Sequence, residues 1–259
     1  MENERPDFDI IVNREKLIDR ILSPISRLSS KAVIVLDGNR LFALANMSNE
    51  NNGQMFMLSD LPMEASYNGV AEMVLTGVSK MIVALKAVKS ETVTLHYDGT
   101  GLDYRSQTVS FRVRLSSETI TLPFKKDKVL SLKPVAWLRI ESMHLREFSG
   151  LLAGFPNLNQ LEIVQDKHTE SFTFHNTDRS GVTDEKLDFR FTHPSDESGD
   201  VPENFLIYNY IFRSTNLANL GYITVRIGNA FAMVVSENEL GQPDKGCIRY
   251  ILPKLKPKA

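Results

Sequence analysis

The most constraining feature of this chain is a pattern that occurs four times. Each copy predicts an amphipathic helix, a strand, a tight turn and a second strand. The clearest copy runs from Met73 to Arg105 and turns at 98–101, where Asp, Gly, Thr and Gly follow one another. The other copies lie at Lys16–Ala45, Glu141–Phe174 and Phe205–Val235. Two copies per half predict a pseudo-symmetric chain, and such repetition favours a large continuous surface over one catalytic pocket.

Apolar periodicity places the four predicted helices. The first begins near Arg14 and carries one apolar stripe as far as Leu28, with Pro24 expected to end or kink its last turns. The second is predicted over about 71–83, the third over about 145–155 and the fourth over about 205–216. Two runs, 109–115 and 187–191, alternate apolar and polar residues and predict half-buried strands.

Composition restricts the function classes. Thirty basic and thirty-two acidic residues give a net charge of -2, so any basic surface must be local. The polar N-terminus has no signal-peptide core, and no apolar run approaches the ~18 residues that span a bilayer. We therefore expect an intracellular protein without a membrane partner, in the nucleus or cytoplasm of a cell or of an infected host.

Enzyme signatures are absent from the sequence. There is no phosphate-binding loop, no nucleophile elbow, and no histidine spacing typical of a metal site. Gly99 and Gly101 lie between two predicted strands and suit a hairpin turn. The single cysteine, Cys247, lies in an apolar run and is expected to be a packed, inert thiol. We expect no catalytic residues, no metal and no cofactor.

Basic residues on the polar faces of the helices remain as candidate binding residues. If all four helices lie on one side of the sheets, their polar faces form one locally cationic surface. Such a surface contacts phosphates without sequence preference. The candidate DNA-binding residues are Lys16, Arg20, Arg27, Lys80, Lys86, Arg146 and Arg213.

The order of these features resembles a known family. The ending Gly246–Lys254 (GCIRYILPK), the run 161–164 (LEIV) and the strand 111–115 (FRVRL) occur in the order and spacing of proliferating cell nuclear antigen, the eukaryotic and archaeal sliding clamp. The resemblance covers nearly the whole chain and suggests a viral or phage version. It implies an α+β DNA-clamp fold with two similar domains, helices on the inner face and antiparallel sheets on the outer face. The implied domains are 1–117 and 136–259, joined by a connector at 118–135.

The resemblance also implies partners. Three subunits would close into a ring around duplex DNA, and the ring would bind a DNA polymerase, a clamp loader and other clamp-binding peptides. Arg20 and Lys80 match inward-facing lysines of the family most directly. On the third helix, positions that are basic in the family are Glu147 and Gly150 here, so the DNA-facing charge is expected to be uneven between the halves.

Two further surfaces follow from the resemblance. Subunits of the family pair edge strands, and exposed edges need a partner or protection. The matching interface residues are Phe111, Val113, Leu115, Leu187, Phe189 and Phe191. Partner peptides would bind under the connector, in a pocket formed by Leu44, Met55, Met57, Leu130, Leu132, Tyr250, Leu252 and Pro253.

The sequence favours a processivity factor without catalytic activity, and two alternatives stay open. One is a monomeric, clamp-like polymerase subunit that binds DNA from one side. The other is an enzyme or peptide-binding scaffold built on a repeated α+β fold.

Overall fold

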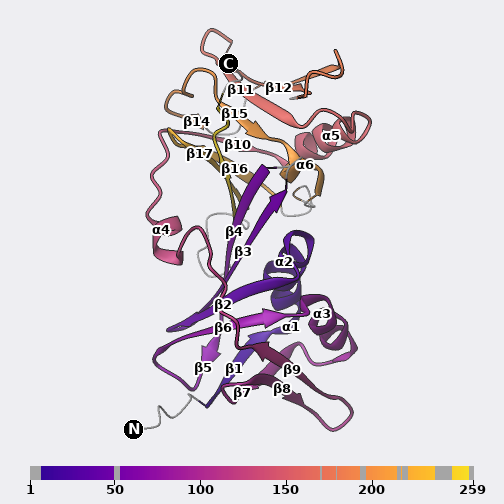
Figure 1. Cartoon of the computed structure of the whole chain (residues 1–259), viewed down its shortest axis with the longest axis vertical. Helices are drawn as coiled ribbons and strands as arrows, with labels where there is room; N and C mark the ends of the chain where they lie inside the picture. The colour runs from indigo at the N-terminus through magenta and orange to yellow at the C-terminus, as the bar shows by residue number, and fades with distance from the viewer. Residues whose placement is uncertain are drawn as a thin grey trace. The chain divides into compact units, whose positions relative to one another are not determined.

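The computed structural model describes residues 7–49, 53–169, 171–178, 180–192, 197–214, 217, 221–236 and 247–256. These form two compact units (Figure 1). Unit 1 contains Met1–Asn46, Met57–Lys126 and Pro243–Ile248, and unit 2 contains Met47–Phe56, Asp127–Gln242 and Arg249–Ala259. The boundary between the longest segment of unit 1 and the longest segment of unit 2 lies between Lys126 and Asp127, inside the segment 118–135 that we predicted as a connector.

All four predicted copies of the repeat are confirmed, because each contains a helix followed by an antiparallel hairpin. The helices are α1 (Arg14–Lys16), η1 (Leu17–Leu22), α2 (Ser23–Leu28), α3 (Val78–Ala87), α4 (Lys126–Leu130), α5 (Ser142–Ala153) and α6 (Tyr210–Ser214). The hairpins of the repeat are β2–β3 (Lys31–Asp37, Arg40–Asn49), β7–β8 (Thr92–Tyr97, Gly101–Arg105), β11–β12 (Gln160–Asp166, Ser171–Thr177) and β16–β17 (Ile223–Ile227, Phe231–Ser236). The remaining strands are β1 (Phe8–Asn13), β4 (Gly53–Pro62), β5 (Glu64–Ala65), β6 (Val70–Thr76), β9 (Ser110–Ser116), β10 (Ala136–Ile140), β13 (Lys186–Thr192), β14 (Glu197–Ser198), β15 (Leu206–Tyr208) and β18 (Cys247–Pro253).

The first helix is one helical segment with a wide turn in its middle. The Asn13 side chain caps it by accepting a hydrogen bond from the Lys16 N–H. Pro24 has no N–H to donate and its ring crowds the carbonyl of residue 20, which interrupts the regular ladder. Residues 17–22 accordingly form a π-helical turn, and the Ser23 N–H bonds to the Ile18 carbonyl. Pro24 therefore widens the helix without ending it, and α2 continues to Leu28.

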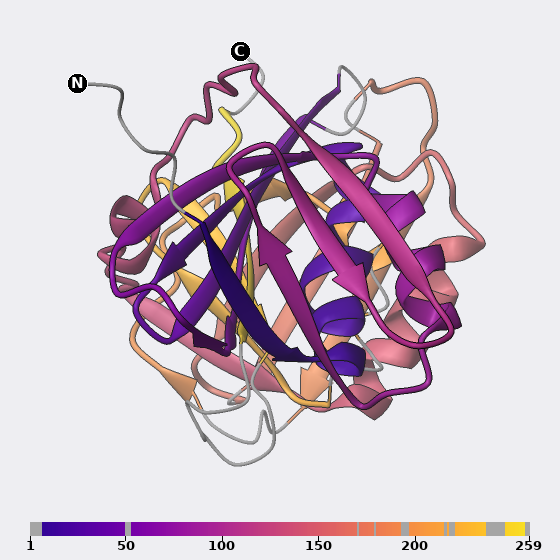
Figure 2. The ribbon, with the colours of Figure 1, turned by 90° about the horizontal axis from the view of Figure 1, so that it is seen from below.

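Unit 1 contains the strands β2-β6-β9-β8-β7-β1-β5 in that order, together with the parts of β3 and β4 that lie outside Met47–Phe56. Its helices pack side by side, with α3 against both η1 and α2, as Figures 1 and 2 show. Ile21, Leu22 and Leu85 on these helices are fully buried. Burial of each such side chain contributes about 1.5–3 kcal/mol, which fixes the helix pair and leaves its polar face in solvent.

Unit 2 contains two groups of strands, β14-β10-β16-β17-β18 and β13-β12-β11-β15. Helices α5 and α6 pack together within it. Phe148 of α5 is fully buried, and its ring lies 5.3–5.5 Å from those of Phe174, Phe189 and Phe212. This aromatic cluster joins both helices to strands β12 and β13.

Two helix predictions were wrong at their first residues. Residues 71–76 form part of strand β6, which pairs with β2 from Lys31↔Thr76 to Asp37↔Val70. Gly77, at φ +71°, separates this strand from α3. The fourth helix covers only Tyr210–Ser214, because Leu206–Tyr208 pair with β11 as strand β15. Thr215 and Asn216 of that prediction, and Gly246 of the terminal motif, lie outside the described residues. None of the helices in the described part is both long enough and apolar enough to cross a bilayer.

Candidate nucleic-acid interface

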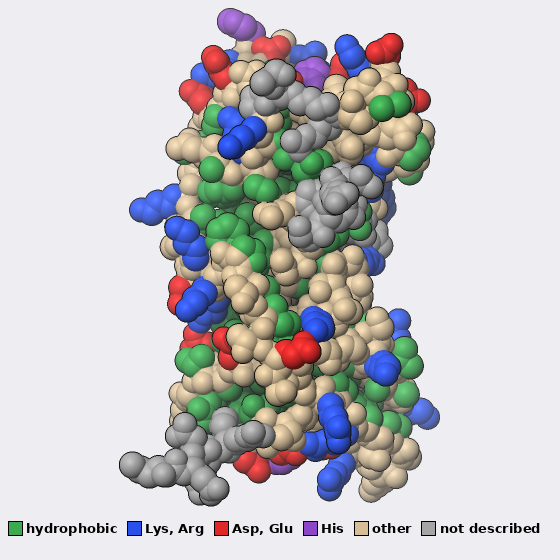
Figure 3. Space-filling model, viewed as in Figure 1, with side chains coloured by type: hydrophobic (Ala, Val, Ile, Leu, Met, Phe, Trp, Pro, Cys, Tyr) green, Lys and Arg blue, Asp and Glu red, His purple; other side chains and the backbone are tan. Residues whose placement is uncertain are grey.

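The helix pair of unit 1 presents most of the predicted basic residues to solvent. Four of them are exposed and have no ion-pair partner among the described residues: Lys16, Arg27, Lys80 and Lys86. Figure 3 shows Lys and Arg side chains gathered over the part of unit 1 that holds α3, β8 and β9. Exposed cations without acidic partners can contact the phosphates of a duplex.

Arg20 lies in a different environment from the other cations. It is half-buried on the π-helical turn, and its Nη1 is buried without a hydrogen-bond partner among the described residues. Burial lowers the pKa of the Arg20 guanidinium. Its neighbour Asp19 is exposed and carries the opposite charge. Arg20, one of the two positions that match the family most directly, is therefore a weaker candidate for a phosphate contact than the exposed cations.

In unit 2 the two predicted cations present less accessible positive charge to solvent than those of unit 1. Arg146 is exposed on α5, but the next residue is the exposed Glu147. The Arg213 guanidinium donates to three backbone carbonyls: Nη1 to Pro156 at 2.9 Å, and Nη2 to Phe155 at 2.6 Å and to Leu158. Burial lowers the pKa of Arg213. Assigning Arg213 to DNA needs correction, because its donors hold the chain between α5 and β11 to α6.

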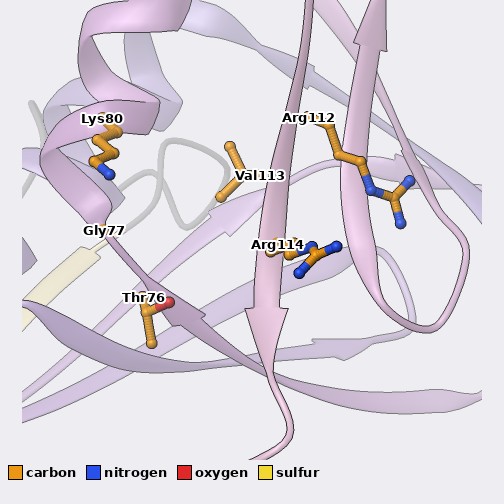
Figure 4. Close-up of a pocket in the computed structure, with 6 residues that line it drawn as sticks. All are labelled: Thr76, Gly77, Lys80, Arg112, Val113 and Arg114. Carbon is orange, nitrogen blue, oxygen red and sulfur yellow. The ribbon is translucent and has the colours of Figure 1, made fainter.

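A basic cleft opens beside strand β9, and sequence analysis missed it. Its volume is about 540 Å³, and it is lined by Thr76, Gly77, Lys80, Arg112, Val113 and Arg114 (Figure 4). Val113 points from β9 toward α3, whereas the Arg112 guanidinium points away. The cleft exists because β9 pairs with β6 only at residues 115 and 116, so the two strands diverge. No local pattern in the sequence reveals that divergence.

Strand β9 has an open edge along this cleft. Residues 110–114 pair with β8 on one side, and no described strand pairs with them on the other. Phe111, Val113 and Leu115 are half-buried, with Phe111 stacked on Tyr104 at 5.3 Å. Arg112 is held by ion pairs to Asp98, at 2.7 Å, and to Asp103. The hydrogen bond from Arg112, then the one from the Thr100 N–H, lowers the pKa of the Asp98 carboxyl.

Strand β13 is one of the two edge strands of its sheet, with β12 as its only described neighbour. Leu187 is half-buried, as expected for an interface position. Phe189 and Phe191 are 8% and 3% exposed because they pack into the aromatic cluster of their own unit. The assignment of these two rings to the subunit interface is therefore corrected, because they are already buried within their own unit. Strand β13 offers mainly its backbone and its polar side chains.

The predicted partner pocket is mostly core. Five of its eight residues are fully or almost fully buried in the protein: Leu44, Met55, Met57, Tyr250 and Leu252. Side chains alternate between the two faces of a strand, and these five lie on the faces that pack into the core. They are therefore not available to line an exposed pocket. Leu130 on α4 is 46% exposed, and Leu132 and Pro253 are half-buried. Only these three can contact a partner.

Comparisons with known proteins agree with this architecture. No family model matches the chain, and no curated protein matches it in sequence. Solved structures do match. Proliferating cellular nuclear antigen from Entamoeba histolytica aligns with a TM-score of 0.70 and 11% identity, over 96% of this chain and 99% of that one.

Two further structures extend the likeness. A. fulgidus PCNA, solved with the C-terminal region of FEN-1, aligns with a TM-score of 0.66 and 17% identity, over 97% of this chain and all of the other. The beta subunit of DNA polymerase III from Thermotoga maritima aligns with a TM-score of 0.68 and 12% identity, over 97% of this chain and 66% of that one. The chain therefore has the α+β fold of sliding-clamp subunits, as its sequence predicted.

Proposed function

We propose that the protein is a DNA sliding clamp, a processivity factor without catalytic activity of its own. The observation that carries this proposal is the helix pair of unit 1, which presents exposed cations on its solvent face and packs on antiparallel strands. In a chain with the clamp fold, such a face suits duplex DNA. Phosphate contacts of this kind are independent of base sequence and weak enough individually to permit sliding.

Ring closure is proposed to use the two open strand edges. The edge of β9 on one subunit would pair with β13 of the next, forming a continuous antiparallel sheet between copies. Unpaired edges present a row of free N–H and C=O groups that favour such pairing. Three subunits would complete the ring. Half-buried Phe111, Val113 and Leu187 supply the apolar part of the contact.

Polymerase tethering is the proposed outcome of closure. A ring that encircles DNA keeps a bound polymerase at high effective concentration near the primer end, so that rebinding is faster than escape. We place the polymerase contact at Leu130, Leu132 and Pro253, the accessible residues of the predicted pocket. A clamp loader and other clamp-binding peptides are expected to use the same surface.

Light scattering tests the ring. The expected mass is three times the subunit mass of 29.2 kDa. Val113→Asp places a charge in the cleft beside the β9 edge and should reduce the mass to that of one subunit. Val182→Asp, at a loop residue that is 83% exposed, is the matched control and should remain trimeric.

A topological assay tests encirclement. Protein is bound to circular duplex DNA at low salt, and the salt is then raised until phosphate contacts break. A closed ring stays on circles and is lost when a restriction enzyme linearises them. Equal retention on circular and linear DNA, together with the mass of one subunit, would replace the ring by the monomeric accessory subunit. A chemical activity lost on changing one polar residue would favour the enzyme alternative.

A further inference from the structure

The exposed cations on the helix pair of unit 1 lie at its two ends. At one end, the start of α1 is bonded to the segment after α3. The Arg14 N–H donates to the Glu91 carbonyl at 2.7 Å, and Arg14 Nη1 donates to the Val88 carbonyl at 2.6 Å. This brings the first turn of α1, with Lys16, beside the last turn of α3 and the residues that follow it. Lys86 and Lys89 lie there, and both are exposed.

The opposite end is fixed in the same way. The Gly77 N–H, just before α3, donates to the Ser30 carbonyl, just after α2, at 3.3 Å. The exposed Arg27 in the last turn of α2 and the exposed Lys80 in the first turn of α3 therefore lie at one end. The two helices run antiparallel. A rise of ~1.5 Å per residue separates the two cation groups by roughly 10–16 Å.

Between the two groups the helix pair has little accessible positive charge. Arg20 is half-buried there, and Asp19 is exposed. On α3, the exposed residue between Lys80 and Lys86 is Val83, which is 70% exposed and apolar. The cationic surface of the helix pair itself is therefore two separate groups at the helix ends and no continuous stripe.

Helices α5 and α6 of unit 2 offer no equivalent of these groups among their described residues. On α5 the exposed side chains are Met143, Arg146, Glu147, Leu151 and Ala153, with one charge of each sign. On α6, Arg213 is held by backbone carbonyls. Arg213 would have to give up these hydrogen bonds before it could bind a phosphate.

We infer that the chain contacts duplex DNA through unit 1 alone, with one phosphate contact group made by Lys16, Lys86 and Lys89 and a second made by Arg27 and Lys80. Lys89 is a phosphate contact that sequence analysis missed, because it follows the helix and escapes a helix-face argument. Helices α5 and α6 of unit 2 supply no phosphate contact group, which departs from the resemblance, where the helices of both halves supply cations. The inference rests on the proposed function in assuming that duplex DNA is the ligand.

Salt titration of duplex binding tests the inference. The full chain is mixed with a short fluorescein-labelled duplex, and anisotropy gives the affinity over a series of KCl concentrations. The slope of log affinity against log salt falls by about 0.9 for each phosphate contact removed. Slopes are compared per subunit bound to the duplex, and we expect Lys89→Gln to flatten the slope by about one contact per subunit. Lys16→Gln combined with Lys86→Gln, and Arg27→Gln combined with Lys80→Gln, should each flatten it by up to two.

Matched variants decide the result. Arg105→Gln, at an exposed arginine on β8, is the charge control and should leave the slope unchanged. Arg146→Gln should change the slope by less than half a contact. The inference is overturned if Arg146→Gln flattens the slope as much as Arg27→Gln alone, if Lys89→Gln leaves it unchanged, or if the unmodified chain does not bind duplex at low salt. A trimeric mass and retention on circles, measured separately, would leave the clamp proposal intact after such a failure.

Discussion

Arg213 gives the sharpest test of the site assignments, because the structure moves it from a ligand contact to a structural role. Arg213→Met keeps most of the side-chain volume and removes every donor. A hydrogen bond from a charged donor contributes about 1.5–3 kcal/mol, and a carbonyl left unpaired inside the protein adds a cost. Three carbonyls share one partly exposed guanidinium, and water can reach some of them, so we expect a loss of about 2–4 kcal/mol in the free energy of unfolding of unit 2.

Urea denaturation measures this loss directly. Trp137, the single tryptophan, lies on β10 in unit 2 and reports the unfolding of that unit by its fluorescence. With an m-value of about 2 kcal/mol/M, the midpoint should fall by roughly 1–2 M. Arg146→Met, at an exposed position of the same unit, should change the free energy by less than about 0.5 kcal/mol.

Lysine supplies an intermediate case. Arg213→Lys places a single ammonium at the end of a flexible chain and cannot reproduce the planar fork, so its midpoint should lie between those of Met and Arg. Unchanged unfolding of Arg213→Met, combined with a flatter salt slope for duplex binding, would refute the structural assignment and restore Arg213 to the DNA-contacting set.

Three other predictions concern stability. Asp98 has a lowered pKa in the folded state, so its contribution is present above the ordinary carboxyl pKa of about 4 and is lost as pH falls below it; acid unfolding of Asp98→Asn should depend less steeply on pH than that of the unmodified chain. Gly150 lies exposed inside α5 with open space around its Cβ position, so Gly150→Ala should raise the free energy of unfolding by about 0.5–1 kcal/mol in urea titrations. Gly77 has φ +71°, so Gly77→Ala should lower the free energy of unfolding by about 1–2 kcal/mol. Asparagine tolerates that backbone conformation better, so Gly77→Asn should lower the free energy of unfolding less in the same assay.

Local sequence signals predicted the parts of the fold that depend on neighbouring residues. The β2–β3 turn follows from Gly38, at φ +55°, and the third helix follows from the spacing of Leu145, Phe148 and Leu152. Strand β6 was missed because its identity depends on pairing with β2, about forty residues away in the chain. The apolar run before Gly77 fits a helix or a strand equally well without that partner.

The candidate site was predictable only in part, for the same reason. Apolar periodicity predicts which face of a helix is exposed. It correctly predicted exposed side chains at Lys16, Arg27, Lys80 and Lys86. The carbonyls that hold Arg213 come from residues 55–58 positions away. The burial of Leu44 and Tyr250 depends on sheet faces that only the assembled strands define.

The interleaving of the two units has a consequence for limited proteolysis. A cut between Lys126 and Asp127 produces two fragments, but each fragment keeps a piece of the other unit. Met47–Phe56 of unit 2 precede the cut, and residues 247 and 248 of unit 1 follow it. Such a nicked protein should migrate as one species on a sizing column and as two bands only after denaturation. Expressed apart, the two fragments would each lack strand residues, so the halves of this repeat cannot be treated as separable modules.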